Sequence, residues 1–63
     1  MDGFDYYVKK KVYVILKNKR VYQGVVDSVE NTGNSLVFIY LTDKFGNKIT
    51  FTSGEIEVLE EKQ

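Results

Sequence analysis

Apolar and polar residues alternate between Val12 and Leu36, and a single glycine interrupts the second alternating stretch. A period of two places successive side chains on opposite faces of a β-strand. Gly24 lies inside that second stretch, where a glycine indicates a bulge, a sharp bend or a close approach of another backbone. Two interpretations fit this spacing. One is a long, strongly bent strand of a very small barrel, and the other is an ordinary hairpin with one tolerated glycine.

The alternation and the turn residues predict five β-strands after a short N-terminal helix. The helix is expected over residues 1–8, with Asp2 as its N-cap. The strands are predicted over residues 11–17, 20–30, 35–43, 47–52 and 55–60. The residues predicted to face inward in the first and last strands are Val12, Val14, Leu16, Ile56 and Val58.

The length of 63 residues limits how stable the chain is alone. A domain of this size buries only about 60% of the surface of its unfolded chain, and no cysteine is present to form a disulfide. Residues 1–63 are therefore predicted to form one all-β domain, with a charged tail over residues 61–63. Its stability is expected to come from the apolar core or from partner subunits.

The absence of cysteine and histidine removes the commonest nucleophile–base pairs and metal ligands. We therefore predict no enzymatic activity, no cofactor and no small-molecule substrate. No apolar stretch reaches the length of a membrane-spanning helix, and no basic region is followed by an apolar one as in a signal peptide. The expected location is the cytoplasm, with no membrane partner.

The charges sum to zero but are unevenly spread along the chain. Six of the nine basic residues lie between Lys9 and Arg20, and four of the nine acidic residues lie between Glu55 and Glu61. The basic segment is either a phosphate-binding patch or a solvated helix end and hairpin tip. A molecule with a basic end and an acidic end is also able to associate head to tail, and such a contact can close into a ring.

The segment from Val12 to Leu36 resembles the first Sm motif of the Sm-like proteins. The matching positions are Val12, Val14, Leu16, Asn18, Arg20, Tyr22, Gly24, Val26, Val29, Glu30, Asn34 and Leu36. Lys19 stands where the family usually has glycine, and Glu30 stands where the family has Asp. The resemblance implies a five-stranded, strongly bent, SH3-like small barrel over residues 9–60, with a short N-terminal helix.

The resemblance also implies a candidate RNA site. In the family, an Asn after the second-strand turn reads the base edge, and Asn34 holds that position here. The family stacks the base between an aromatic or His and an Arg, but these positions hold Thr32 and Ser53, the latter before Gly54. Two of the three pocket elements are missing, which predicts altered or lost uridine recognition. The candidate RNA-binding residues are Asn34, Glu30, Thr32, Ser53, Gly54, Lys17, Lys19 and Arg20.

The function predicted from these features is a non-enzymatic Sm-like scaffold. It is expected to form a homo-oligomer in which the fourth strand of one subunit pairs with the fifth strand of the next. It is also expected to bind single-stranded RNA weakly or in a non-standard mode. The alternative is a protein–protein interaction module with no nucleic-acid role, and salt-dependent binding to RNA distinguishes the two.

Overall fold

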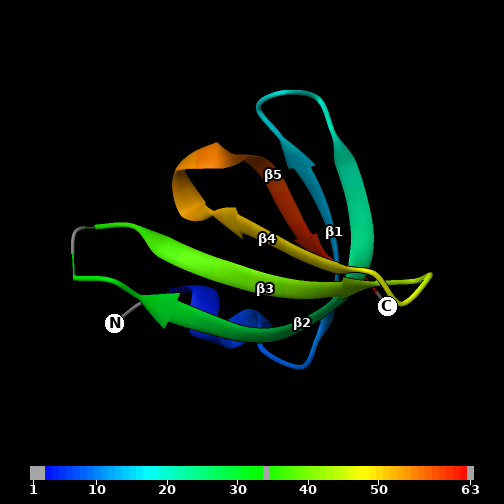
Figure 1. Cartoon of the computed structure of the whole chain (residues 1–63), viewed down its shortest axis with the longest axis horizontal. Coiled ribbons are helices and arrows are strands. Elements are labelled where there is room, and N and C mark those ends of the chain that lie inside the picture. Colours follow the sequence, from blue (N-terminus) through cyan, green and yellow to red (C-terminus); the bar gives the residue numbers. More distant parts are fainter. Residues whose placement is uncertain (1–2, 34, 63) are drawn as a thin grey trace.

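The computed structural model describes residues 3–33 and 35–62. Its elements are η1 (Gly3–Tyr7), β1 (Lys11–Leu16), β2 (Val21–Asn31), β3 (Val37–Asp43), β4 (Lys48–Thr52), η2 (Ser53–Glu55) and β5 (Ile56–Glu61) (Figure 1). The prediction of five strands is confirmed, with each boundary within two residues of its expected position. In the N-terminal segment the described residues form the 3₁₀ helix η1, and the predicted N-cap Asp2 lies outside the described residues.

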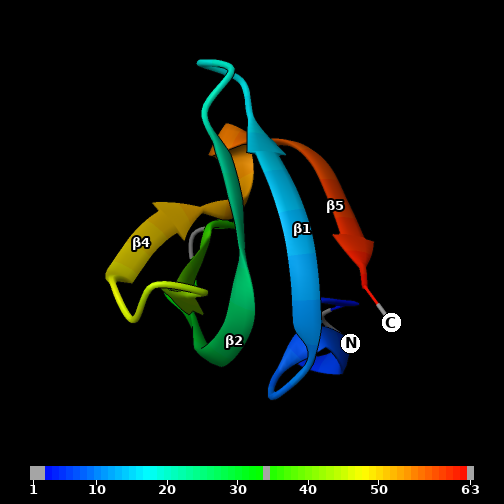
Figure 2. The ribbon, with the colours of Figure 1, turned by 90° about the vertical axis from the view of Figure 1, so that its right-hand side faces the viewer.

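All five strands belong to one antiparallel sheet in the order β4-β3-β2-β1-β5. β2 pairs with β1 through residues 21–25 and with β3 from residue 24 onward. The β2–β3 register shifts between Val26 and Ser28, and such a β-bulge bends the strand. Figures 1 and 2 show the resulting turn in the direction of β2. Within the described residues β4 and β5 are the edges of the sheet. The all-β prediction is confirmed, but the sheet is not the closed barrel that was predicted, because in the described part of the chain β4 and β5 do not pair with each other.

Gly24 lies where β2 has a paired strand on both sides. A Cβ added to Gly24 would lie 2.1 Å from the backbone oxygen of Thr42 and 2.6 Å from the Cα of Asp43. The close approach of another backbone is therefore the reason for the glycine, and the bulge lies further along, at Asp27. The sequence left these alternatives open.

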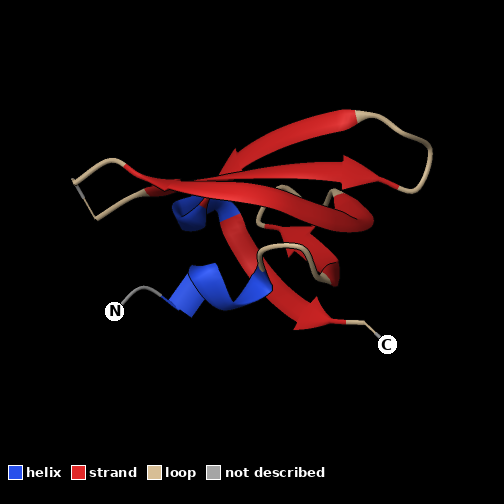
Figure 3. Ribbon diagram, turned by 90° about the horizontal axis from the view of Figure 1, so that it is seen from below, coloured by secondary structure: helices blue, strands red, loops and turns tan. Residues whose placement is uncertain are grey.

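The core is built from one face of β1, β2, β3 and β4. Its buried residues are Val12, Val14, Leu16, Val26, Val37, Ile39, Leu41 and Phe51. The inward set predicted for β1 is confirmed, and no polar side chain is buried among the described residues. Figure 3 shows both 3₁₀ helices on the same side of the long β2–β3 hairpin. In the described part of the chain, no helix has the length and apolar character that crossing a bilayer requires.

The inward set predicted for β5 is wrong at one position. The β1–β5 register shifts so that Leu16 pairs with Ile56 and Ile15 pairs with Val58, which leaves Glu57 without a partner on β1. This irregularity reverses the alternation along β5. As a result Ile56 and Leu59 pack against the core, whereas Val58 lies beside Ile15 on the other face.

Candidate nucleic-acid interface

The predicted basic residues lie on the tip between β1 and β2. A φ of 75° at Lys19 allows the chain to reverse, and the Arg20 N–H donates a hydrogen bond of 3.0 Å to Asn18 Oδ1. The Lys17 N–H donates to the carbonyl of Glu55 at 2.8 Å. This bond joins the tip to η2, and the three basic side chains of the tip are exposed.

One of these basic side chains is already paired with an acid. Lys19 Nζ lies 3.1 Å from Oε1 of Glu57 on β5 and 3.4 Å from Oε2. The Lys19 and Glu57 side chains are 76% and 45% exposed, so solvent screens the pair and it adds little to stability. The pair still lowers the positive potential of the tip, which then depends mostly on Lys17 and Arg20.

The loop between β2 and β3 is held by its own side chains. Asn31 Oδ1 accepts a hydrogen bond from the Gly33 N–H at 2.9 Å. Thr32 donates through its N–H and its hydroxyl to the carbonyl of Leu36, at 3.2 and 3.0 Å. Thr32 therefore has a structural role in the loop. Asn34, the predicted base-reading residue, lies outside the described residues.

η2 lies against the start of β3, beside this loop. The Val37 N–H donates to the Ser53 hydroxyl oxygen at 3.2 Å, and a Cβ on Gly54 would lie 3.5 Å from Leu36 Cδ2. The structure thus brings the turn with Ser53 and Gly54 next to the loop with Thr32. Neither this turn nor this loop carries the aromatic ring or the guanidinium between which Sm-like proteins stack a base.

The same turn also connects the loop to the basic tip. The Thr52 N–H donates to Glu55 Oε1 at 3.0 Å, which fixes the first turn of η2. The backbone carbonyl of Glu55 accepts the bond from Lys17. η2 is therefore a common support for the tip and the β2–β3 loop.

Glu30 takes a different role from the loop-holding acid of the family. Its Oε1 accepts a hydrogen bond of 2.8 Å from the hydroxyl of Tyr40 on β3. This hydrogen bond is the main cause of the raised pKa of Tyr40. The loop is held instead by Asn31, which the sequence reasoning missed although an Asn two residues before a glycine is typical of an Asx turn.

No protein-family model matches this chain, and searches of curated proteins and of solved structures find no match. The Sm-like resemblance therefore depends only on the sequence positions between Val12 and Leu36 and on Ser53 and Gly54. Within residues 3–33 and 35–62, no group of three or more acidic side chains is placed to hold a metal ion.

Proposed function

We propose that this protein is a cytoplasmic, non-enzymatic scaffold of Sm-like type that self-associates through β4 and β5 and binds single-stranded RNA weakly. The observation that carries the proposal is the strand order, which leaves β4 and β5 as the two edges of one sheet. An edge strand presents backbone N–H and C=O groups to which another strand can bind. A β4–β5 contact between neighbouring copies is heterologous, and it forms a ring if the rotation between copies closes.

The distribution of apolar surface supports this association. Ile49 of β4 and Ile56 and Leu59 of β5 pack against the core but remain partly exposed. A strand added to either edge would cover more of these side chains, and burial of apolar surface stabilises an association by about 25 cal/mol per Å².

The backbone of β4 provides a specific test. The Asp43 N–H donates to the carbonyl of Asn47. Backbone groups of alternate residues point to the same edge of a strand, so Asp43, Leu41 and Ile39 direct theirs toward β4. The pairs Leu41–Ile49 and Ile39–Phe51 are then the hydrogen-bonded ones. The N–H of Thr50, which lies between them, points away from β3 and toward the open edge.

Two variants at this exposed position separate the backbone donor from the side chain. Thr50→Pro removes the outward N–H at a position where an edge strand tolerates proline, whereas Thr50→Val keeps the N–H and the β-branched shape. Light scattering then gives the mass in solution at several concentrations. We expect multimers for the parent and Thr50→Val, and a folded monomer for Thr50→Pro. A monomeric parent at high concentration, or a multimeric Thr50→Pro, would contradict the proposal.

Weak RNA binding is proposed from the basic tip and from the turn beside it. Base stacking contributes about 1–3 kcal/mol per base in other proteins, and Thr32 and Ser53 cannot supply it. Phosphate attraction to Lys17 and Arg20 is then the main contribution, so the affinity should fall steeply with salt. The test titrates oligouridine and a mixed-sequence RNA at two salt concentrations.

Three outcomes of this titration are informative. We expect weak binding that is abolished by salt. The double variant Lys17→Ala/Arg20→Ala should not bind. Tight, salt-insensitive binding that selects uridine would contradict the proposed mode. No binding to either RNA at low salt would favour the alternative, a protein-interaction module with no nucleic-acid role.

A further inference from the structure

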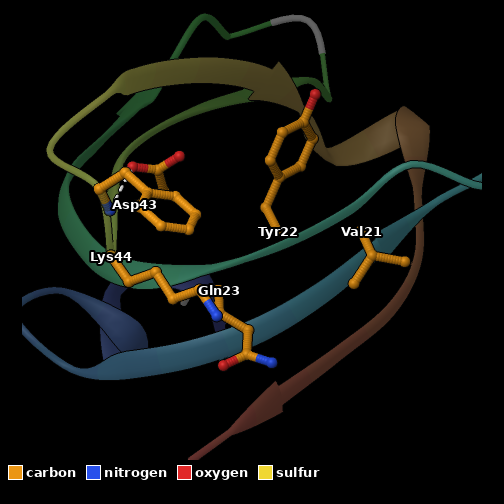
Figure 4. A pocket seen from close by; sticks show the side chains of 6 residues that line it. Val21, Tyr22, Gln23, Asp43 and Lys44 are labelled. Carbon is orange, nitrogen blue, oxygen red and sulfur yellow. Dashed lines mark hydrogen bonds between the residues drawn. The ribbon is translucent and has the colours of Figure 1, made fainter.

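A groove lies between the first half of β2 and the turn that joins β3 to β4. Two adjoining hollows of about 220 and 340 Å³ form it, and both are lined by Gln23, Asp43 and Lys44. Figure 4 shows the first hollow, with Tyr22 directed into it from β2 and Asp43 and Lys44 on the other side. None of the predicted site residues lines the groove, although Val21 directly follows Arg20 of the basic tip.

Exposed apolar side chains are concentrated at this groove. Val21, Val25 and Phe45 line it and are 50%, 36% and 78% exposed. They are three of the five large apolar side chains that are exposed in the described part of the chain. Hairpin tips and outward strand faces are usually polar, so apolar surface gathered beside a hollow indicates an interaction site.

The backbone of β2 is open at the same place. The β2–β3 pairing begins at Gly24 and Asp43, and one more bond joins the Lys44 N–H to the Gln23 carbonyl at 3.1 Å. Alternate residues direct their backbone groups to the same edge of a strand. Val21 therefore directs its N–H and C=O away from β1 and past the end of β3. On that edge of β2, no described strand pairs with Val21. An extended peptide can add to such an edge through main-chain hydrogen bonds.

The charges along the groove favour an acidic partner. Lys44 lines both hollows, and Lys11 lines the second. Asp43 is the acidic residue that lines the groove, and its carboxylate is hydrogen-bonded within the turn over residues 43–47. Its carboxylate accepts hydrogen bonds from the N–H groups of Phe45 and Asn47 at 2.9 and 2.8 Å, and from the Asn47 side-chain amide at 3.3 Å. Two cations beside apolar surface complement a segment that carries both carboxylates and apolar side chains.

We propose that this groove binds an extended, acidic and apolar peptide segment of a partner protein. Apolar side chains of the peptide contact Val21, Val25 and Phe45, and a carboxylate pairs with Lys44. The peptide main chain bonds to the open backbone of Val21 only, because β3 already occupies this edge of β2 from Gln23 to Val25, and the peptide reaches Val25 by its side chain. Val21 and Val25 are separated by four residues of strand, about 13 Å, which matches two apolar peptide residues at positions i and i+4. None of the residues that line this site belongs to β4, to β5 or to the proposed RNA site.

The probe is a ten-residue synthetic peptide with two leucines four residues apart and glutamates between and after them. Two matched peptides carry glutamine or lysine in place of the glutamates. Amide chemical shifts of the isotopically labelled protein locate the binding site, and titration gives the affinity. We expect the largest shifts at Val21, Gln23 and Lys44. The glutamine peptide should bind about tenfold more weakly, because a charge-assisted contact is lost, and the lysine peptide more weakly still.

Surface variants test the assigned contacts without disturbing the core. Phe45→Ser removes the exposed ring, and Lys44→Glu reverses the charge. Leu36→Ser is the matched control, because Leu36 is 41% exposed but does not line the groove. We expect the first two variants to weaken binding of the acidic peptide about tenfold or more and the control to leave it unchanged. Lys44→Glu should also improve binding of the lysine peptide.

The results that overturn the proposal are equally specific. Millimolar acidic peptide that shifts no amide of the groove would overturn it, as would equal affinity for the three peptides. A loss of binding in Leu36→Ser as large as that in Phe45→Ser would also overturn it, because general exposed apolar surface would then explain the binding.

Discussion

Gly24→Ala adds one carbon between two backbones, and its effect follows directly from the geometry of β2 and β3. The added Cβ would lie 2.1 Å from the Thr42 oxygen, 2.6 Å from the Asp43 Cα and 2.8 Å from the Thr42 carbonyl carbon. Real Cβ atoms essentially never approach other atoms within 3.0 Å. All three atoms belong to backbone, so no side-chain rotation relieves the overlap. The two strands must separate by about 0.9 Å at the point where their pairing begins.

Two terms set the size of the loss. Extra carbon forced into a packed site costs about 1–3 kcal/mol. The separation also weakens backbone bonds at this end of the ladder, including the bond from Lys44 to Gln23, each contributing about 0.5–1.5 kcal/mol. We expect Gly24→Ala to lower the free energy of unfolding by about 1.5–4.5 kcal/mol. A domain of 63 residues has only about 3–9 kcal/mol in total, so the variant should be close to unfolding.

Urea unfolding followed by circular dichroism measures this loss, at one fixed protein concentration because association would add to the stability. Gly54→Ala is the matched control, since its Cβ would only touch the flexible side chain of Leu36 at 3.5 Å. The control should stay within about 0.5 kcal/mol of the parent. If Gly24→Ala unfolds at the same urea concentration as Gly54→Ala, the argument from backbone approach is refuted.

Three further substitutions test the core, a turn and the response to pH. Phe51→Ala removes a phenyl ring that is 3% exposed, so the free energy of unfolding should fall by about 3–5 kcal/mol in the same urea assay; a loss below about 1 kcal/mol would contradict its place in the core. Gly46→Ala introduces a Cβ at a φ of 87° with nothing within 4 Å. Backbone strain alone should therefore destabilise the fold by about 1–2 kcal/mol and lower the Tm. An unchanged Tm would argue against the left-handed conformation of Gly46. Desolvation opposes the ionisation of Asp43, but hydrogen bonds from Asn47 and Phe45 together outweigh it and lower the pKa of Asp43 below its ordinary value of 3.8. The ionised carboxylate therefore stabilises the fold above pH 3.8, and this contribution is lost as the pH falls through the lower folded-state pKa. Asp43→Asn should be less stable than the parent at pH 7 and should approach it in urea titrations at progressively lower pH below 3.8; a difference independent of pH would contradict this assignment.

Part of the candidate site could be predicted because turns have local signatures. Asn18 at the β1–β2 tip and Asn31 and Gly33 in the β2–β3 loop indicated chain reversals, and both reversals are present. Whether their side chains remain available for a ligand could not be predicted. Thr32 bonds to the carbonyl of Leu36, and Lys19 pairs with Glu57, 38 residues further along the chain. Such bonds depend on distances that exist only in the folded chain.

The sequence by itself determined the strands and the inward face of β1, because a period of two is a local property of an extended backbone. It also marked Gly24 as a special position. The tertiary structure alone decided why Gly24 must be glycine, since the reason is the backbone of Thr42, 18 residues away. It also decided that Leu59 replaces Val58 on the inner face, because the irregularity arises from the register between two strands. The groove depends in the same way on the register between β2 and β3, which places Gly24 opposite Asp43 and so brings residues 21–25 beside residues 43–45.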